Sequence, residues 1–290
     1  WLNGVRVVRP VLLRNRDCIR ICDYVLVFVG NRLIYQVGHS KRENNLEVNI
    51  HSKVVADKKG KGTKQLLSDI KFSLPGDCLV AILGGSGAGK TTLLNCVNGM
   101  EPDGVRGEIR LNGEDLLGNF ERMKYKIGSV PQENVLHEAY RVLDELRDAA
   151  ILRLPNDTTR KEIRAKVEEV IGKLGLEKVK KSRISQLSGG EKKRVNIGIE
   201  LVADRDVLCL DEPDAGLDSQ SVQQLTRLLK SLAHDSHKLI VTIIHNLSEI
   251  DEYDQLVFLA PGGKLAFCGS PEAAKQYFHV QSIKEIYGKL

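Results

Sequence analysis

The stretch ILGGSGAGKTT at residues 82–92 constrains what this chain can fold into more than any other feature of its sequence. It begins at the end of the apolar run CLVAI, which is typical of a buried strand, and it ends with a lysine and two threonines. Glycines let the backbone adopt conformations that other residues avoid and approach a ligand closely, and a helix N-terminus adds unpaired N–H groups. The pattern therefore predicts a strand, a loop around a polyphosphate and a helix that begins at Lys90.

The spacing within this loop assigns separate tasks to its residues. Gly84, four further residues, Gly89, Lys90 and Thr91 follow the Walker A pattern, in which the lysine reaches the β and γ phosphates and the threonine hydroxyl holds Mg²⁺. A flexible glycine loop with a chance lysine is the competing interpretation, so other motifs have to support the site. The candidate phosphate contacts are Gly84, Gly85, Ser86, Gly87, Ala88, Gly89, Lys90, Thr91 and Thr92.

The composition is that of an ordinary globular protein. With 290 residues, 42% of them hydrophobic and 28% charged, the chain can bury a sizeable core in one or two domains. It contains no apolar run long enough for a transmembrane helix and no charged-then-apolar signal segment at its start. Because the sequence begins at Trp1 without an initiator methionine, we expect a cytosolic piece of a larger protein.

The charges and cysteines indicate no further chemistry. The net charge of +5 is modest, and the clusters KKGKGTK at 58–64 and KVKKSR at 178–183 are typical of solvated loops, with an anionic membrane surface or nucleic acid as the alternative. Of the six cysteines, only Cys18 and Cys22 are close together, and neither a second pair nor a nearby histidine completes a zinc site. We predict reduced structural thiols.

The order of predicted elements divides the chain into parts. Residues 1–37 combine β-branched and aromatic residues with turn signals, which predicts short strands of an all-β unit that cannot close a core alone. The polar stretch GHSKRENN at 38–45 is a predicted linker. From residue 46 onward, strands alternate with helices, which indicates an α/β domain around a largely parallel sheet.

A long helical stretch is predicted from about residue 137 to residue 205. Within it, Thr159 and Glu162 stand at the spacing of a capping box, and Gly175 is a stop signal. Between them, apolar residues recur on one helical face, so this helix is amphipathic and packs on its neighbours. The charges on its other face are expected to be solvated.

Four further groups of residues could complete a phosphate site. The strand VLCLDE ends in Asp211 and Glu212, which could serve Mg²⁺ and an attacking water. The stretch LSGGE at 187–191 places Ser188 and two glycines at the start of a helix, a second anion-binding terminus. Gln132, after one strand, offers an amide to a metal and a water, and His245, after another, offers a donor to a phosphate.

These motifs together resemble the nucleotide-binding domain of an ATP-binding cassette transporter. Over residues 46–280 the chain has Walker A, Gln132 as the Q-loop, the signature LSGGE, Walker B, the D-loop AGLD and the switch histidine in family order. The stretches SGGEKKRVNIGIEL, DEPDAGLDS and GGKLAFCGSPEAAKQYF resemble the G subfamily, in which this domain precedes a membrane domain. The resemblance implies an α/β fold with a mixed sheet, an antiparallel β subdomain and a helical subdomain at about 133–205, within a domain spanning 46–290.

The resemblance also implies how the site is assembled. Two copies would pair head to tail, so that ATP held by the Walker A loop of one is covered by the signature of the other. The implied catalytic residues are Glu212, His245, Gln132 and Lys90, and the implied Mg²⁺ ligands are Thr91, Gln132 and Asp211. Further ATP contacts would be Ser188, Gly189, Gly190 and Asp218, of which Asp218 would couple the two sites.

The same resemblance implies partners and a location. A transmembrane permease domain would follow in the same chain and dock on the helical stretch, and the pair would drive transport, with export favoured by the G-type motifs. The protein would then lie at the cytoplasmic face of a bacterial membrane, and no nucleic acid is expected. Residues 1–37, with WLNGVRV and DCIRICDYVLVF, resemble the end of a forkhead-associated domain, without the strands that carry its phosphothreonine contacts.

Two departures from the family pattern stand out. The stretch HSKVVADKKGKGTKQ lacks the aromatic residue that usually stacks on adenine, so we predict weak base selectivity, with Val54 or Val55 as an apolar platform. Asp214 adds a carboxylate after Walker B, where threonine is commoner in the family, and the sequence does not explain it.

Two other classes of function were weighed. A soluble cassette in repair would need a long coiled-coil insertion, but Lys90 and Ser188 are only 188 − 90 = 98 positions apart, and a translation-type protein would carry a second cassette. A regulatory module without turnover is disfavoured because Glu212 and His245 are both in place.

Overall fold

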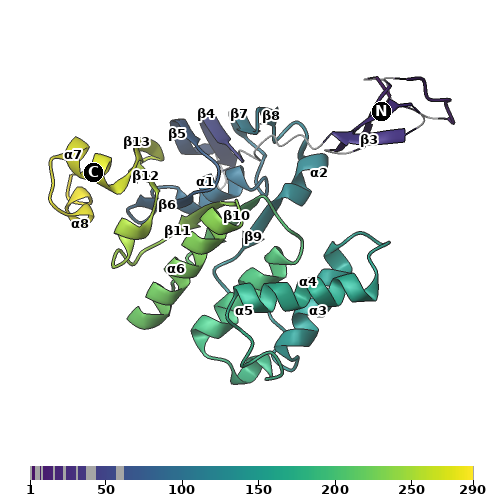
Figure 1. Cartoon of the computed structure of the whole chain (residues 1–290). Coiled ribbons are helices and arrows are strands. Elements are labelled where there is room, and N and C mark those ends of the chain that lie inside the picture. Colours follow the sequence, from purple (N-terminus) through teal and green to yellow (C-terminus); the bar gives the residue numbers. More distant parts are fainter. Residues whose placement is uncertain are drawn as a thin grey trace. The chain divides into compact units, whose positions relative to one another are not determined.

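The chain divides into two compact units, Trp1–Arg42 and Glu43–Leu290, in its computed structural model (Figure 1). The expected linker at 38–45 lies outside the described residues apart from its last two positions. The structure describes residues 2–3, 7, 9–15, 17–21, 24–30, 32–36, 44–56 and 62–289.

The first unit is a three-stranded antiparallel meander. Its strands are β1 (Cys18–Ile21), β2 (Tyr24–Val29) and β3 (Arg32–Gln36), and a turn at Gly30, whose φ is 53°, joins the last two. The predicted strands are therefore confirmed. Leu33 of β3 is 52% exposed, as expected of a sheet too small to enclose a core. The likeness to a forkhead-associated domain stays a prediction.

The second unit is built on one ten-stranded mixed sheet, in the order β8-β7-β4-β5-β13-β12-β6-β11-β10-β9. Its centre is parallel, because strands β12, β6, β11, β10 and β9 pair in the same direction. The remaining strands pair antiparallel, except that β13 meets β5 in parallel at a single position. The bounds are β4 (Leu46–Ala56), β5 (Thr63–Leu74), β6 (Leu79–Gly84), β7 (Val105–Leu111), β8 (Glu114–Asp115), β9 (Ile127–Val130), β10 (Val207–Asp211), β11 (Leu239–Ile243), β12 (Gln255–Ala260) and β13 (Lys264–Gly269).

The helices of this unit form separate groups (Figure 1). Helix α1 follows the Walker A loop, and α3, α4 and α5 lie together as a helical subdomain beside the sheet (Figure 1). The helices are α1 (Lys90–Val97), α2 (Phe120–Met123), α3 (Val142–Arg153), α4 (Arg160–Lys173), α5 (Gly189–Leu201), α6 (Ser219–Asp235), α7 (Pro271–Phe278) and α8 (Ile283–Ile286), with short 3₁₀ turns at Lys124–Lys126, Ile184–Gln186 and Ile250–Glu252.

The predicted amphipathic helix is α4, and its ends are confirmed. Thr159 is the N-cap and forms a capping box with Glu162, while Gly175, with a φ of 63°, follows its last turn. Val167, Val170 and Ile171 are buried on its inner face. Local sequence signals therefore fix this helix, and packing against α3 and α5 stabilises it.

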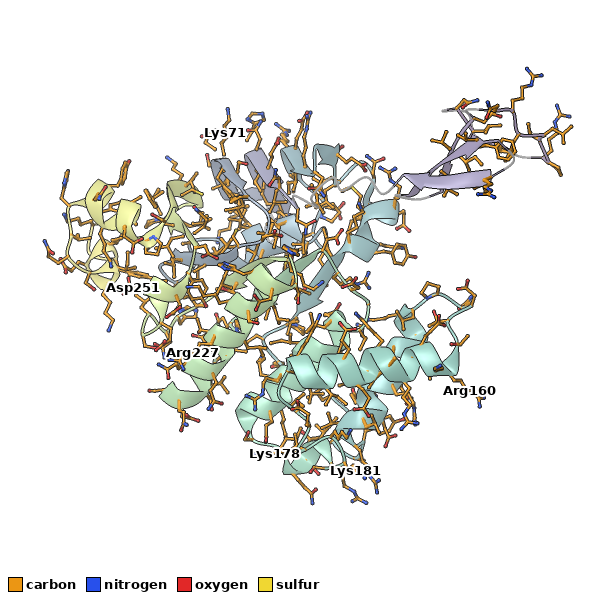
Figure 2. The ribbon with its side chains drawn as sticks, viewed as in Figure 1. Lys71, Arg160, Lys178, Lys181, Arg227 and Asp251 are labelled. Atoms are coloured by element: carbon orange, nitrogen blue, oxygen red, sulfur yellow. The ribbon has the colours of Figure 1, made fainter. Side chains whose placement is uncertain are left out.

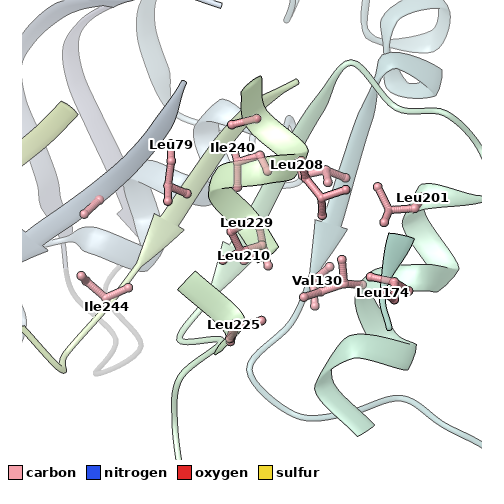
Figure 3. Packing of buried hydrophobic residues seen from close by; sticks show 14 of the residues in the cluster. Leu79, Val130, Leu174, Leu201, Leu208, Leu210, Leu225, Leu229, Ile240 and Ile244 are labelled. Atoms are coloured by element: carbon pink, nitrogen blue, oxygen red, sulfur yellow. The ribbon is translucent and has the colours of Figure 1, made fainter. Parts of the chain in front are cut away.

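The core occupies both faces of the sheet, which explains why the central strands are apolar throughout. Leu79 of β6 faces α6 and the helical subdomain, whereas Val80 faces α1, and the alternation continues along the strand. Figure 3 shows the first face, where Leu225 and Leu229 of α6 pack near Leu210 of β10. The motif-bearing loops at the strand ends are thus carried by rigid, buried strands.

The surface charges are solvated where the sequence predicted it. Lys178 and Lys181 point away from the helical subdomain into solvent (Figure 2), although Lys180, between them, is paired with Glu168 at 2.8 Å. Most of the other cluster, 58–64, lies outside the described residues.

The four cysteines whose side chains are described are free thiols. Within the described ranges, no helix has the length and apolar character needed to cross a membrane.

Candidate functional site

The Walker A loop leaves the buried strand β6 and enters α1. Gly84 has a φ of 150°, and a Cβ atom there would lie 2.5 Å from the backbone oxygen of Leu259, so this position requires glycine. Gly89 is the N-cap of α1, with a φ of 94° and no side chain to cap the helix. The first N–H groups of α1 are therefore open to an anion.

Lys90 is buried beneath this loop. Its side chain is 8% exposed, and its ammonium donates to the backbone oxygens of Gly84 at 2.9 Å and Gly85 at 3.1 Å. Burial lowers the pKa of Lys90, while the nearby charges of Glu212 and Asp211 act in the opposite direction. A buried cation held only by carbonyl oxygens favours an anionic ligand, as a phosphate-binding lysine must.

Asp211, at the end of β10, lies beside the start of α1. The Thr91 side chain hydrogen-bonds its carboxylate, and the buried Asp211 Oδ1 has no hydrogen-bond partner in the part of the chain that the structure describes. Burial raises the pKa of Asp211, and the charge of Glu212 adds to the rise. A carboxylate oxygen that lacks a partner, next to a threonine hydroxyl, is a donor set that suits Mg²⁺.

Glu212 lies between two side chains from other strands. Its Oε2 accepts a hydrogen bond from Gln132 Nε2 at 2.8 Å, and its Oε1 lies 2.7 Å from His245 Nε2. The three residues follow β10, β9 and β11, which are adjacent and parallel, so their carboxyl ends meet at one edge of the sheet. The sequence placed each residue after a strand, and the topology brings them together.

The backbone of Glu212 has an unusual conformation that the sequence did not reveal. Its φ is 44°, in the left-handed region that non-glycine residues seldom occupy. Hydrogen bonds hold it there, from its N–H to the oxygen of Ile243 at 3.1 Å and from the N–H of Ala215 to its oxygen at 3.1 Å. Strain of this kind concentrates at functional sites, because the surrounding structure must maintain it.

The signature residues form a separate group. Ser188 is the N-cap of α5 and forms a capping box with Glu191, and Asp218 caps α6 by accepting hydrogen bonds from Ser221. A Cβ atom added at Gly190 would lie 3.3 Å from Ser221 Oγ, and one added at Gly189 would lie 3.4 Å from Leu217. In the described chain, no hydrogen bond joins these signature residues to the Walker A loop.

Sequence analysis missed two side chains that support the site. Lys193 of α5 is 3% exposed, and its ammonium donates to the backbone oxygen of Gln132 at 2.8 Å. Tyr287, after α8, packs edge-on against Phe258 and hydrogen-bonds with the backbone of Gly84. The sequence could have indicated Lys193 only through its position on the inner face of the signature helix, where a lysine needs a buried partner. No sequence feature indicated Tyr287.

The platform expected for the adenine is only partly visible. Val54 and Val55 are half-buried at the end of β4, whereas residues 57–61 lie outside the described part of the chain. Weak base selectivity therefore stays a prediction, to be measured by comparing ATP and GTP binding in titration calorimetry. Much tighter binding of ATP would contradict it.

A family model described as "ABC transporter" matches residues 67–215, a segment that includes Walker A, the Q-loop, the signature and Walker B. The chain belongs to the ABC transporter family. The cassettes of this family hydrolyse ATP, and this chain has the fold and the motif residues of such an ATPase.

Curated ABC transporter relatives cover nearly the whole chain. An ABC transporter ATP-binding/permease protein of Mycobacterium tuberculosis is 35% identical over 276 residues, which are 93% of this chain and 31% of that protein. ABC transporter G family member 26 of Arabidopsis thaliana is 35% identical over 255 residues, 84% of this chain and 36% of that protein. The chain thus spans about a third of the length of these relatives, and its relatives include the G subfamily.

Solved ABC cassettes share the fold. The structure of cbiO1 from Clostridium perfringens, part of an ABC transporter complex, has a TM-score of 0.69 at 29% identity and covers 85% of this chain and 94% of that one. A dimeric ATP-binding cassette in a post-hydrolysis state, bound to ADP and Pi, has a TM-score of 0.66 at 23% identity and covers 78% of this chain and 98% of that one. The predicted fold class, an α/β ATPase core with a mixed sheet, is confirmed.

Proposed function

We propose that this chain is the ATP-hydrolysing motor of an exporter, and that it works as a head-to-tail pair with a second copy of itself. The observation that carries the proposal is the position of Glu212 between Gln132 and His245, next to the Walker A loop. A carboxylate held by an amide and an imidazole at the end of a parallel sheet is suited to orient and deprotonate a water that attacks a γ phosphate.

Each side chain has a separate task in this proposal. Lys90 leaves the loop carbonyls for the β and γ phosphates, and the N–H groups at the start of α1 bind the same oxygens. His245 leaves Glu212 to hold the γ phosphate, which frees one carboxylate oxygen for the attacking water. These residues supply positioning and charge stabilisation, the main contributions of a protein to phosphoryl transfer.

We assign the Mg²⁺ site to Thr91, Asp211 and Gln132. The partnerless Asp211 Oδ1 and the adjacent Thr91 hydroxyl support the assignment. When bound, the ion would neutralise charge that develops on the phosphate oxygens. Gln132 is kept near these ligands by its hydrogen bond to Glu212.

The second half of each ATP site comes from the partner copy in this proposal. Ser188, Gly189 and Gly190 begin α5 with N–H groups that can bind a γ phosphate, and Asp218 is placed at the start of α6 next to them. A solved structure with this fold is a dimeric cassette bound to ADP and Pi, which supports a paired arrangement. Closing and opening of the pair would be the mechanical output.

Transport by the whole protein rests on its relatives. The mycobacterial relative is an ATP-binding/permease protein, of which this chain matches about a third. We therefore propose a membrane domain after the cassette in the same chain, export of a substrate, and a position at the cytoplasmic face of a bacterial membrane. The relatives reported above are transporters, so work on nucleic acid is not carried further.

We also propose the domain boundaries, with a cassette at 46–290 that contains the helical subdomain at about 133–205. The antiparallel meander of β1, β2 and β3 is compatible with the end of a forkhead-associated sandwich at 1–37, joined through a linker at 38–45.

The test is Glu212→Gln, which keeps the shape of the side chain and removes its charge. We expect the variant to bind ATP with Mg²⁺, to accumulate as a dimer in sedimentation, and to release phosphate about 100-fold more slowly than the wild type. Glu169→Gln is the matched control, because Glu169 lies on α4 between Lys166 and Lys173, and it should turn over normally. If the Glu212 variant stays monomeric and releases phosphate at the wild-type rate, the proposed site is wrong.

A further inference from the structure

Asp214 is the acidic residue near the site that has no assigned task. It lies in the turn after β10, where its backbone oxygen accepts a hydrogen bond from Leu217 in the D-loop at 3.2 Å. Its side chain is directed inward, and among the described residues its buried Oδ1 has no hydrogen-bond partner. Burial raises the pKa of Asp214, and hydrogen bonds from the backbone around His245 and Asn246 act against that rise. Something must offset the free energy of burying this carboxylate.

One hydrogen bond connects Asp214 to the residue that follows His245. Asp214 Oδ2 accepts a hydrogen bond from the backbone N–H of Asn246 at 3.1 Å. The peptide held by this bond joins Asn246 to His245, whose imidazole lies 2.7 Å from Glu212. The direction in which His245 leaves the end of β11 therefore depends on the Asp214 carboxylate.

A second connection joins Asp214 to Gln132 through the buried side chain of Lys193. Lys193 is almost fully buried, and the carboxylates whose charges act on its ammonium are first Asp214 and then Asp211. The Lys193 ammonium donates to the backbone oxygen of Gln132 at 2.8 Å, and the Gln132 amide donates to Glu212 at 2.8 Å. The negative charge of Asp214 therefore offsets part of the free energy of burying this ammonium.

We propose that Asp214 is a positioning residue that sets both hydrogen-bond partners of Glu212, His245 through the Asn246 peptide and Gln132 through Lys193. Its side-chain hydrogen bond among the described residues goes to Asn246 and not to Glu212, so its effect on hydrolysis is indirect. The carboxylate lies in the loop after β10 and bonds the loop after β11, while its charge acts on Lys193, which bonds the loop after β9. In this way it holds the side chains of these loops in the geometry that hydrolysis requires. This inference rests on the proposed function, because it assigns a task within the same site.

The first experiment separates binding from turnover. Asp214→Ala should lower kcat for ATP about tenfold with a change in KM of less than about twofold, because the Walker A loop is intact while the groups around Glu212 are misplaced. Asp214→Asn keeps an oxygen for the Asn246 N–H but loses the charge that acts on Lys193, so its kcat should lie between those of the wild type and Asp214→Ala. The control is Asp251→Ala, an exposed aspartate paired with Lys275, which should leave kcat unchanged.

The second experiment asks whether Asp214 acts through its neighbours. In a His245→Ala background, one of the two partners is gone, so Asp214→Ala should cost clearly less than the tenfold seen in the wild-type background. Thermal unfolding of every variant reports whether it folds, and if Asp214→Ala does not, the same cycle is run with Asp214→Asn and His245→Ala.

The outcomes distinguish the two proposals. An unchanged kcat in both Asp214 variants, or an equal loss in the wild-type and His245→Ala backgrounds, would overturn the positioning role while leaving the ATPase site intact. A loss expressed mainly in KM would overturn it as well. If Glu212→Gln also turned over normally, the failure would belong to the proposed function instead.

Discussion

The Walker A half and the signature half of this cassette differ in how their residues are held. On the Walker A side, Thr91 of α1 hydrogen-bonds Asp211 at the end of β10. Glu212, the next residue, bonds both Gln132 in the loop after β9 and His245 in the loop after β11. On the signature side, the hydrogen bonds that Ser188 and Asp218 form with described residues lie within their own helix starts. One half is held together by side-chain contacts between strand ends, and the other is a pair of capped helix starts. In the proposed head-to-tail pair, the signature half of one copy would meet the Walker A half of the other.

The largest effect should come from separating the two halves. Lys90→Ala removes the buried cation of one half, and Gly190→Asp adds a carboxylate where the other half would meet a γ phosphate, so each variant alone should lose at least about 100-fold in phosphate release. The aspartate is compatible with the first turn of α5, where negative charge is favourable. In an equal mixture, half of the dimers contain one copy of each variant. Each mixed dimer has one intact composite site where a wild-type dimer has two, so roughly a quarter of the wild-type rate should return.

The control for this mixture is each variant mixed with itself at the same total concentration. Recovery must depend on protein concentration, because it requires a dimer. If the mixture stays as inactive as its components although both variants fold and sediment as dimers with ATP, the two halves do not belong to one composite site.

A smaller effect separates the glycines of the two halves. Gly84→Ala forces a Cβ atom to within 2.5 Å of the Leu259 oxygen at a φ of 150°, so it should lower the free energy of unfolding by about 1–3 kcal/mol and weaken ATP binding by the monomer. Gly190→Ala meets only the movable side chain of Ser221 and keeps a helical backbone, so stability and monomer binding should be unchanged while ATP-dependent dimerisation weakens. Thermal unfolding, calorimetry and sedimentation measure these quantities, and equal loss of stability in both variants would contradict the distinction.

The same two halves show what the sequence can and cannot predict. The capping boxes at Thr159 and Ser188 depend on residues three positions apart, and the apolar strands depend on short runs, so both are readable locally. The sequence also indicated that Gln132, Glu212 and His245 follow strands. It could not show that they meet, because the order of β9, β10 and β11 is a tertiary fact.

The sequence did not predict the backbone conformation and the side-chain contacts that hold the site together. The left-handed φ of Glu212 is held by a hydrogen bond from its N–H to β11 and by one that its oxygen accepts from the following turn. The burial of Lys193 depends on α5 packing near Gln132. Asp214 was visible as a departure from the family pattern, but its relation to Asn246 crosses 32 positions. Such contacts follow from packing and have no local sequence signal.

The smallest effect comes from a pair of matched helix caps. Ser188 and Thr159 form the same capping box, on α5 and α4 of one subdomain, each accepting from the backbone N–H of a glutamate three positions on at 3.3 Å. Replacing either by alanine should therefore lower the free energy of unfolding by about the same amount, close to 1 kcal/mol. Only Ser188→Ala also removes a hydroxyl proposed to face a phosphate, so it alone should slow phosphate release, by about tenfold.

Thr159→Ala thus controls for the loss of a cap in the helical subdomain. Denaturant unfolding gives the stabilities, and phosphate release at saturating ATP gives the rates. An equal slowing in both variants would mean that a weakened subdomain, and not the Ser188 hydroxyl, limits hydrolysis. A slowing confined to Ser188→Ala would mean that the signature residues take part in hydrolysis. Within one chain, no hydrogen bond among the described residues joins them to the Walker A loop, so they would have to act on the ATP of a second copy.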